Sequence, residues 1–295
     1  MIMRNSGNRN ASHEDKNQIV GGTLYLVATP IGNLSDISER ALKVLSQVDF
    51  VAAEDTRNTG KLLSYFGISK PMVSYFEHNK RERGLVILER LKAGESCALV
   101  TDAGTPAISD PGEDLVVLCA ENDVCVTSIP GCSAVVNALA LSALPTGRFC
   151  FEGFLSTNKN ERLTRLNELK NDTRTTIFYE APHKLIKTLE DLYEIFGNRR
   201  ISLCRELTKL NEEIIRTTLE GAIEYYKEAS PRGEYVLVLE GCQNPTSKEE
   251  FWKELSVSEH VKYYISKEMK KMDAIKQVAK DRGVSKSEIY KEVNT

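Results

Sequence analysis

The stretch 100–112, which reads VTDAGTPAISDPG, has the composition of a loop that binds a ligand. It follows the apolar run 97–100, so a buried strand is predicted to end where the loop begins. Asp102 places a carboxylate at this point, while two glycines allow close approach of a ligand and two prolines stiffen the chain. An ordinary surface turn is the alternative. Plain connections need only about two to six residues, so a ligand loop is favoured.

Two further turns end apolar runs in the same half of the chain, one at Pro30 and one at Pro130-Gly131. Neither the glycine pattern of dinucleotide-binding folds nor that of a phosphate-binding P-loop occurs, which disfavours a phosphate ligand. The three turns carry almost no cationic side chains. They suit a zwitterionic or neutral ligand that is held by backbone groups.

Elements that would position these turns alternate along the chain. Apolar runs predict strands at 23–28, 50–53, 72–76, 97–100 and 124–129, with helices between them, the first capped by Ser35 or Asp36. A second series starts after Pro145-Thr146-Gly147, with strands at 149–154, 176–179, 201–205 and 235–239 and a hairpin-like excursion at 207–218. The pattern indicates an α/β fold whose ligand site lies at the carboxyl ends of the strands.

The expected division is a disordered tail at 1–20, an N-terminal α/β domain at 21–145, a C-terminal α/β domain at 146–244 and a helical extension at 250–295. The formal charge of −3 does not indicate a general affinity for nucleic acid. Ten Lys and Arg residues against seven Asp and Glu in 251–295 nevertheless give this region a local excess of cations.

The seven cysteines are scattered and form no C-x-x-C pair, which favours reduced thiols and a cytoplasmic location over disulfides or zinc. The histidines lack the spacing of metal ligands, so no metal is expected. The first twenty residues lack the apolar core of a signal peptide, and no apolar run is long enough to span a bilayer.

Several strings in register resemble the tetrapyrrole methylase superfamily, within 23–241: LVATPIGNLSDIS, AAEDTR, VTDAGTPAISDPG, SIPGCSA, EGFL, FYEAPH, RELTK and RGEYVLVLEG. More narrowly, they are similar to members that methylate a cytidine 2'-hydroxyl in 16S ribosomal RNA. The resemblance implies S-adenosyl-L-methionine as cofactor, bound in a cleft between two α/β domains. It also implies 16S rRNA or the small ribosomal subunit as partner, and commonly a homodimer.

Carried over by motif, the resemblance implies these cofactor-binding residues: Pro30, Asp102, Thr105, Ser133, Ala134, Tyr179 and Tyr235, with Glu234 as an alternative to Tyr235. Plain core packing is an equal alternative for both tyrosines. Ser133 has a second role open to it as a helix N-cap, which is compatible with ligand contact because a helix N-terminus offers donors to a carboxylate.

A sulfonium methyl group is already activated, so the protein must align the accepting oxygen and provide an acceptor for its proton. Acids at strand ends are candidates, and we expect Glu54, Asp55 and Arg57 to act in catalysis by placing the substrate. Their mixed charge suits a ribose hydroxyl beside a phosphate. Glu180 and Glu206 are further candidates, with Arg205 and Lys209 as phosphate partners. For any one of these acids, a salt-bridged surface residue is the alternative.

Two other functions stay open from sequence. One is methylation of a ring carbon in a precorrin-type tetrapyrrole, and the other is a binding protein for ribosome assembly without catalysis. The helical extension would place Lys270, Lys271, Lys280, Arg282 and Lys286 near one another, enough for a few phosphate contacts. A solvated tail that packs on its own domain or on a dimer partner is the alternative.

Overall fold

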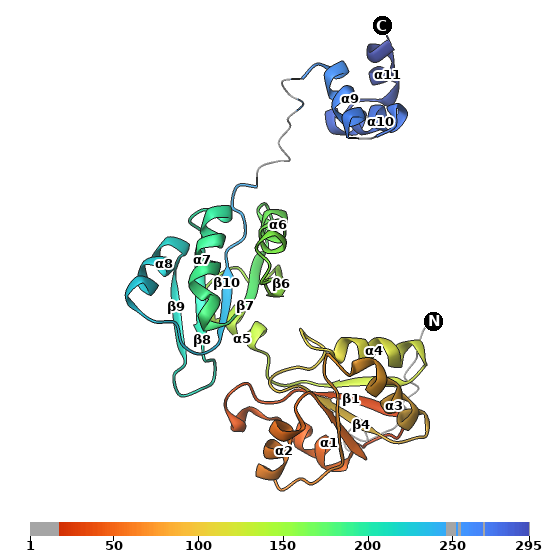
Figure 1. Cartoon of the computed structure of the whole chain (residues 1–295), viewed down its shortest axis with the longest axis vertical. Helices are drawn as coiled ribbons and strands as arrows, with labels where there is room; N and C mark the ends of the chain where they lie inside the picture. Colours follow the sequence, from red (N-terminus) through yellow and green to blue (C-terminus); the bar gives the residue numbers. More distant parts are fainter. Residues whose placement is uncertain (1–17, 246–251, 253–254, 268, 295) are drawn as a thin grey trace. The chain divides into compact units, whose positions relative to one another are not determined.

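The computed structural model describes residues 18–245, 252, 255–267 and 269–294 of the chain (Figure 1). They form two compact units. One unit contains the described residues up to Lys170 together with Arg174–Gly241, and the other contains Asn171–Thr173 and the described residues from Cys242 onward. Residues 1–17 of the predicted disordered tail lie outside the described residues.

The first sheet has five parallel strands in the order β3-β2-β4-β1-β5. They are β1 Thr23–Val27, β2 Phe50–Ala53, β3 Met72–Ser74, β4 Cys97–Val100 and β5 Cys125–Ile129. Every residue of β2 and of β4 is buried, as expected for continuous apolar runs in a parallel sheet covered on both faces. This confirms the α/β class. Because all strands run the same way, their carboxyl ends, and the turns that follow them, share one edge.

Helices cover both faces of this sheet (Figure 1). On one face lie α1 Glu39–Gln47 and α2 Thr56–Tyr65, and on the other α3 Lys80–Lys92 and α4 Gly112–Glu121. The predicted cap of the first helix is wrong by a few residues. Ser35 and Asp36 belong to a short 3₁₀ turn, Leu34–Asp36, and the Ser38 hydroxyl accepts the Ala41 N–H at 3.1 Å to begin α1.

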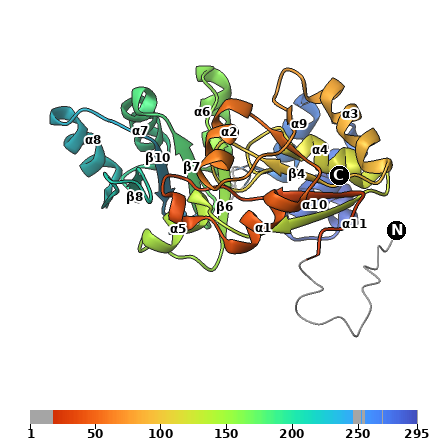
Figure 2. The same ribbon diagram turned by 90° about the horizontal axis from the view of Figure 1, so that it is seen from below.

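The second sheet is mixed, in the order β6-β7-β10-β8-β9. Its strands are β6 Phe149–Phe154, β7 Thr175–Glu180, β8 Arg200–Arg205, β9 Glu213–Thr218 and β10 Tyr235–Leu239. Only the β6 and β7 pair is parallel among these neighbours, and the predicted excursion after β8 contains β9, which pairs antiparallel with it. On one face pack α6 Lys159–Leu169, α7 Pro182–Phe196 and α8 Leu219–Glu228. The opposite face packs α5 Ala134–Leu141; Figure 2 shows α7 and α5 on opposite sides of β8 and β10.

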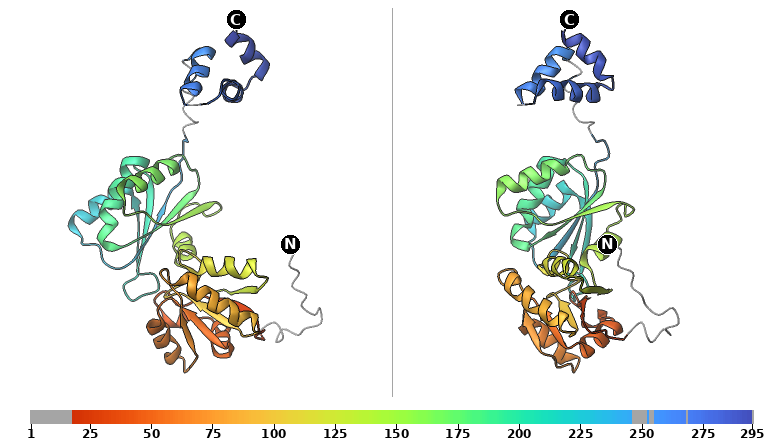
Figure 3. Two further views of the ribbon diagram at one scale, coloured as in Figure 1. Left: turned by 45° about the vertical axis from the view of Figure 1, so that its right-hand side comes forward. Right: turned by 90° about the vertical axis from the view of Figure 1, so that its right-hand side faces the viewer.

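The C-terminal helices α9 Val257–Ser266, α10 Lys271–Arg282 and α11 Lys286–Asn294 pack around a small apolar core of their own (Figure 3). Arg282, expected to contact phosphate, instead donates to the carbonyls of Trp252 and Leu255 and to His260 Nδ1. Its guanidinium therefore holds this unit together. Among the described residues, no helix is both long enough and apolar enough to cross a membrane.

Candidate functional site

A cavity of about 680 Å³ opens at the carboxyl-end edge of the first sheet and reaches the second sheet, within the same compact unit. Its volume is in the range typical of small-molecule sites. From the first half of the chain it is lined by Ile31, Glu54, 101–105, 108–110, Ser133 and Ala134. From the second half it is lined by Phe154, 179–183, Cys204, Glu206, Leu207, Lys209 and 234–236.

The three turns predicted from sequence are joined by hydrogen bonds. The backbones of Thr29 and Gly104 exchange two bonds, with N···O distances of 2.9 and 3.0 Å. The Thr29 hydroxyl donates to the Thr101 carbonyl at 3.1 Å, and the Thr105 hydroxyl donates to the Cys132 carbonyl at 3.0 Å. The first strand end, the central loop and the Pro-Gly turn therefore form one connected wall.

Asp110 fixes the shape of the central loop. Its carboxylate accepts the N–H of Ala107 at 2.9 Å and that of Gly112 at 2.7 Å. These bonds hold Ala107 and Ser109 in left-handed backbone conformations, with φ of 66° and 64°. Such conformations are costly for residues other than glycine, and they persist where surrounding contacts enforce them, often at ligand sites.

Asp102 lines the cavity at the start of this loop, and Asn58 Nδ2 donates to its carboxylate at 3.2 Å. Burial raises the pKa of Asp102, and the nearby carboxylates of Glu54 and Asp55 raise it further. Glu54 also lines the cavity, and its carboxylate accepts the Thr101 hydroxyl at 2.8 Å. The structure thus brings two acids from neighbouring strand ends to one side of the cavity.

Asp55 and Arg57 are not among the lining residues. The Asp55 side chain caps α2 by accepting the Arg57 N–H at 2.8 Å, and it binds the Arg57 guanidinium at 2.7 and 3.1 Å. The same hydrogen bonds lower the pKa of Asp55 to about 2. The Arg57 side chain remains 85% exposed. Asp55 therefore stabilises the start of α2. Arg57 is held in place by Asp55, and its exposed side chain can contact a partner from solvent.

Ser133 and Ala134 line the cavity where α5 begins. Ser133 occupies the N-cap position, as expected, but its side chain accepts no hydrogen bond from the first turn of the helix. This helix terminus is therefore suited to an anionic group. Pro30 is buried and does not line the cavity, whereas its neighbour Ile31 does.

The two predicted tyrosines differ in their surroundings. Tyr179 lies in the cavity wall against Phe151 and Phe154, with ring centroids 4.9 and 5.3 Å apart, and burial raises its pKa. The Tyr235 hydroxyl accepts from the Tyr226 hydroxyl at 3.1 Å and from the Arg232 N–H at 3.2 Å. Tyr235 thus lines the cavity as well, while its phenol packs in the core beneath α8.

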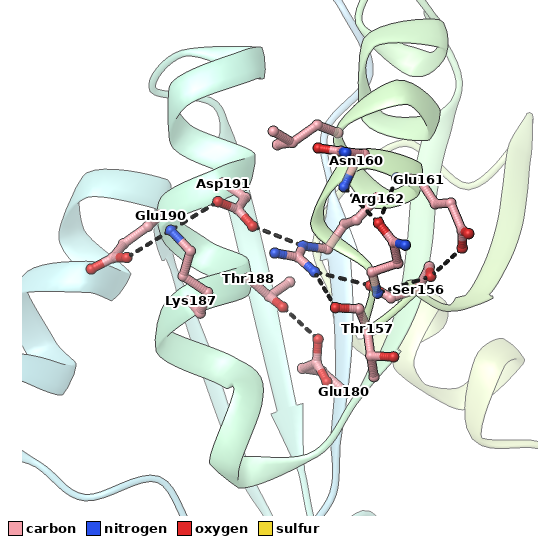
Figure 4. A network of polar contacts seen from close by, with 12 residues as sticks. Ser156, Thr157, Asn160, Glu161, Arg162, Glu180, Lys187, Thr188, Glu190 and Asp191 are labelled. Carbon is pink, nitrogen blue, oxygen red and sulfur yellow. Dashed lines mark hydrogen bonds and ion pairs between the residues drawn. The ribbon is translucent and has the colours of Figure 1, made fainter.

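Glu180 is a buried carboxylate in the same wall, and Figure 4 shows its contact with Thr188 of α7. It accepts the Thr188 hydroxyl at 2.6 Å and the Ala181 N–H at 2.8 Å. One turn further along α7, the buried Asp191 binds Arg162 of α6 at 2.8 Å and Lys187 at 3.0 Å (Figure 4). The helix that supplies Thr188 is therefore anchored by an ion-pair network.

Lys209 lines the cavity between two carboxylates, with 2.9 Å separating its Nζ from Glu206 Oε1 and from Glu234 Oε2. Lys209 is expected from the sequence to contact phosphate, but in the structure its charge is matched by these two acids. Phe154 and His183 also line the cavity and were missed. For Phe154 a signal existed, because a glycine inside a strand, here Gly153, often marks a bulge.

Comparison with known proteins agrees with this architecture. The family model described as Tetrapyrrole (Corrin/Porphyrin) Methylases matches residues 23–223. A protein of Halalkalibacterium halodurans, named ribosomal RNA small subunit methyltransferase I, is 50% identical over 91% of this chain and 93% of its own length. A Bacillus subtilis protein of the same name is 47% identical, also over 91% of this chain and 93% of its own length.

Solved structures share the fold at low sequence identity. A uroporphyrin-III-C-methyltransferase from Thermus thermophilus superposes with a TM-score of 0.54 at 18% identity, over 74% of this chain and 94% of that one. A diphthine synthase superposes with a TM-score of 0.55 at 17% identity, over 74% and 90% of the two chains. On the family match and the close relatives together, this chain belongs to the tetrapyrrole (corrin/porphyrin) methylase family.

Proposed function

We propose that this chain transfers a methyl group from S-adenosylmethionine to a ribose 2'-hydroxyl, that of a cytidine, in 16S ribosomal RNA. The observation that carries the proposal is the set of relatives named ribosomal RNA small subunit methyltransferase I, at 45–50% identity over 91% of the chain for the first three. The fold neighbours include enzymes that act on tetrapyrroles, but at identities of 17–20% they support only the fold.

The cavity fits the proposed cofactor in size and in the chemistry of its walls. Asp102 offers an acceptor to an amino or hydroxyl group, and the start of α5 at Ser133 and Ala134 offers backbone donors to a carboxylate. Gly104 has a φ of 87°, and a side chain there would stand 3.5 Å from Ile31. The loop can therefore approach a ligand at Gly104 without a side chain intervening.

When bound, S-adenosylmethionine supplies an activated methyl group on a cationic sulfur. The protein then has to place the 2'-oxygen in line and accept its proton. Glu54 is our candidate acceptor, because it lines the cavity beside Asp102 and is oriented by Thr101. Arg57, held by Asp55 outside the cavity, is our candidate for binding a phosphate next to the target ribose.

We further propose that the chain has two α/β domains divided at 145–146 and a helical extension from 250. We also propose that it forms a homodimer and acts in the cytoplasm. Phosphate contacts by the extension would now rest on Lys270, Lys271, Lys280 and Lys286, all of which are exposed.

The direct test is methyl transfer from labelled S-adenosylmethionine to small ribosomal subunits, to purified 16S rRNA and to a precorrin-type tetrapyrrole. We expect label in RNA, resistant to alkali at the methylated linkage because the 2'-oxygen is blocked. Label in the tetrapyrrole alone would replace the proposal with ring-carbon methylation. Failure to bind the cofactor in calorimetry, with the protein folded, would favour a non-catalytic binding protein.

A further inference from the structure

We propose that Phe154 is a stacking surface for the nucleobase of the nucleotide that is methylated. Phe154 ends β6 and lines the cavity, yet 61% of it is exposed. An aromatic ring of this exposure contributes little to the apolar core. The inference rests on the proposed function and adds to it the residue that positions the substrate base.

A bulge in β6 turns Phe154 toward the cavity. Phe151 pairs with Ile177 of β7, but the register then shifts, so that Gly153 pairs with Phe178 and Phe154 with Tyr179. Side chains alternate between the faces of a strand. In a regular strand, residues 151 and 154 would therefore point to opposite faces. With Glu152 as the extra residue, both phenylalanines lie on the face of Tyr179, where their rings contact it.

Two neighbouring segments constrain the bulge, one by leaving no room for a side chain at Gly153 and the other by an ion pair to Glu152. Gly153 has a φ of 63°, and a Cβ built there would lie 2.9 Å from Ser109 Oγ in the central loop. Arg165 of α6 binds both carboxylate oxygens of the bulged Glu152, at 2.8 and 3.1 Å. Bulges of this kind re-aim side chains near functional sites. The central loop and α6 thus constrain the two residues that precede Phe154.

A nucleobase is the ligand that this arrangement fits best. Every base has a π-face, and a base that leaves its helix loses stacking that an aromatic side chain can replace. Tyr179 supports the Phe154 ring at 5.3 Å and a tilt of 55°, so the exposed ring surface remains available. Phe154 and Glu54 line the same cavity, so a base held on Phe154 would bring its own ribose toward the proposed acceptor.

The adenine of the cofactor is the other possible source of a base, and the test separates the two. We would measure kcat and KM for small ribosomal subunits, and the dissociation constant of S-adenosylmethionine, for Phe154→Ala, Phe154→Leu and Phe154→Tyr. The matched control is Phe149→Ala, which removes an exposed phenylalanine from the same strand outside the cavity.

For Phe154→Ala we expect KM for the subunit to rise about tenfold, the effect of losing one stacked base. Cofactor affinity and oligomeric state should stay at the wild-type values. Phe154→Tyr should keep the KM of the wild type. Phe154→Leu should raise the KM, because leucine keeps apolar area but has no π-face. Phe149→Ala should behave as wild type.

Three results would overturn the inference. One is an unchanged KM in Phe154→Ala, the second is a loss confined to cofactor affinity, and the third is a change in oligomeric state that accounts for the loss. If the wild-type protein itself fails to methylate the subunit, the proposed function fails first, and that result is visible before any variant is made.

Discussion

The two walls of the cavity are built by different means. The first-sheet wall consists of turns that follow parallel strands, and its parts are joined by backbone bonds such as the Thr29 and Gly104 pair. The second-sheet wall consists of side chains that leave strands and are held by neighbouring helices, as Thr188 holds Glu180. Changes to backbone conformation should therefore damage the first wall, while the second should respond to single side-chain contacts.

The largest effect is expected in the first wall, for Gly104→Val. A β-branched residue is strained at a φ of 87° and would fill space beside Ile31, so we expect cofactor affinity to fall by more than about tenfold. Asp102→Ala should also weaken binding, by about the tenfold that one charged hydrogen bond provides. Calorimetry measures both.

Gly67→Val is the control for backbone strain. Gly67 has a φ of 68°, follows α2, does not line the cavity and has open space around its Cβ position. It should lose stability and keep cofactor affinity. If Gly104→Val and Asp102→Ala both bind the cofactor as wild type, the loop at 102–111 is not the cofactor site.

Next in size is the effect of Arg57→Ala, which tests a residue beside the first wall and outside the cavity. Losing charge-assisted bonds to a phosphate should reduce methyl transfer about tenfold at limiting RNA. Cofactor affinity should not change, because Arg57 does not line the cavity. Lys61→Ala, which removes another exposed cation from α2, is the control. Full activity of Arg57→Ala would leave Asp55 and Arg57 as a structural salt bridge.

The second wall is tested by Thr188→Val, which keeps the shape of the side chain and removes the donor to the buried Glu180 carboxylate. We expect unfolding free energy to fall by about 1–3 kcal/mol, together with a several-fold loss in the affinity of a ligand in the cavity. The control is Thr175→Val, which removes a buried hydroxyl from β7, the strand of Glu180; this hydroxyl donates to the Pro145 carbonyl outside the cavity. If both variants lose stability but bind the ligand of the cavity with the same affinity as each other, Glu180 has no part in the site.

The smallest effect is a shift in pH dependence. The pKa of Asp102 is raised by burial and by neighbouring carboxylates, so its ionised form, which accepts hydrogen bonds, is lost as pH falls through that raised value. The hydrogen bond from Asn58 lowers this pKa. Asn58→Ala should therefore move the fall in cofactor affinity to higher pH. A shift to lower pH, or none, would separate Asp102 from cofactor binding.

The sequence predicted most of the first wall and little of the second. Glycine, proline and aspartate mark turns by their own conformational preferences, so the residue types alone predicted the loop at 102–111 and the turn before Ser133. The direction of Phe154 depends on a register shift against β7, and the role of Thr188 depends on how α7 packs over β7. Neither leaves a periodic pattern. Asp55 and Arg57 were expected to place the substrate, with a salt bridge as the alternative, whereas the use of Asp55 as a helix cap depends on where α2 begins.

Mapping of 2'-O-methyl groups in 16S ribosomal RNA tests the proposed function most directly. RNA from cells that lack this chain should be missing a single 2'-O-methylated cytidine. Expression of the wild-type chain should restore it, and expression of Asp102→Ala to the same level should restore less. An unchanged methylation map in the deletion strain would contradict the proposal.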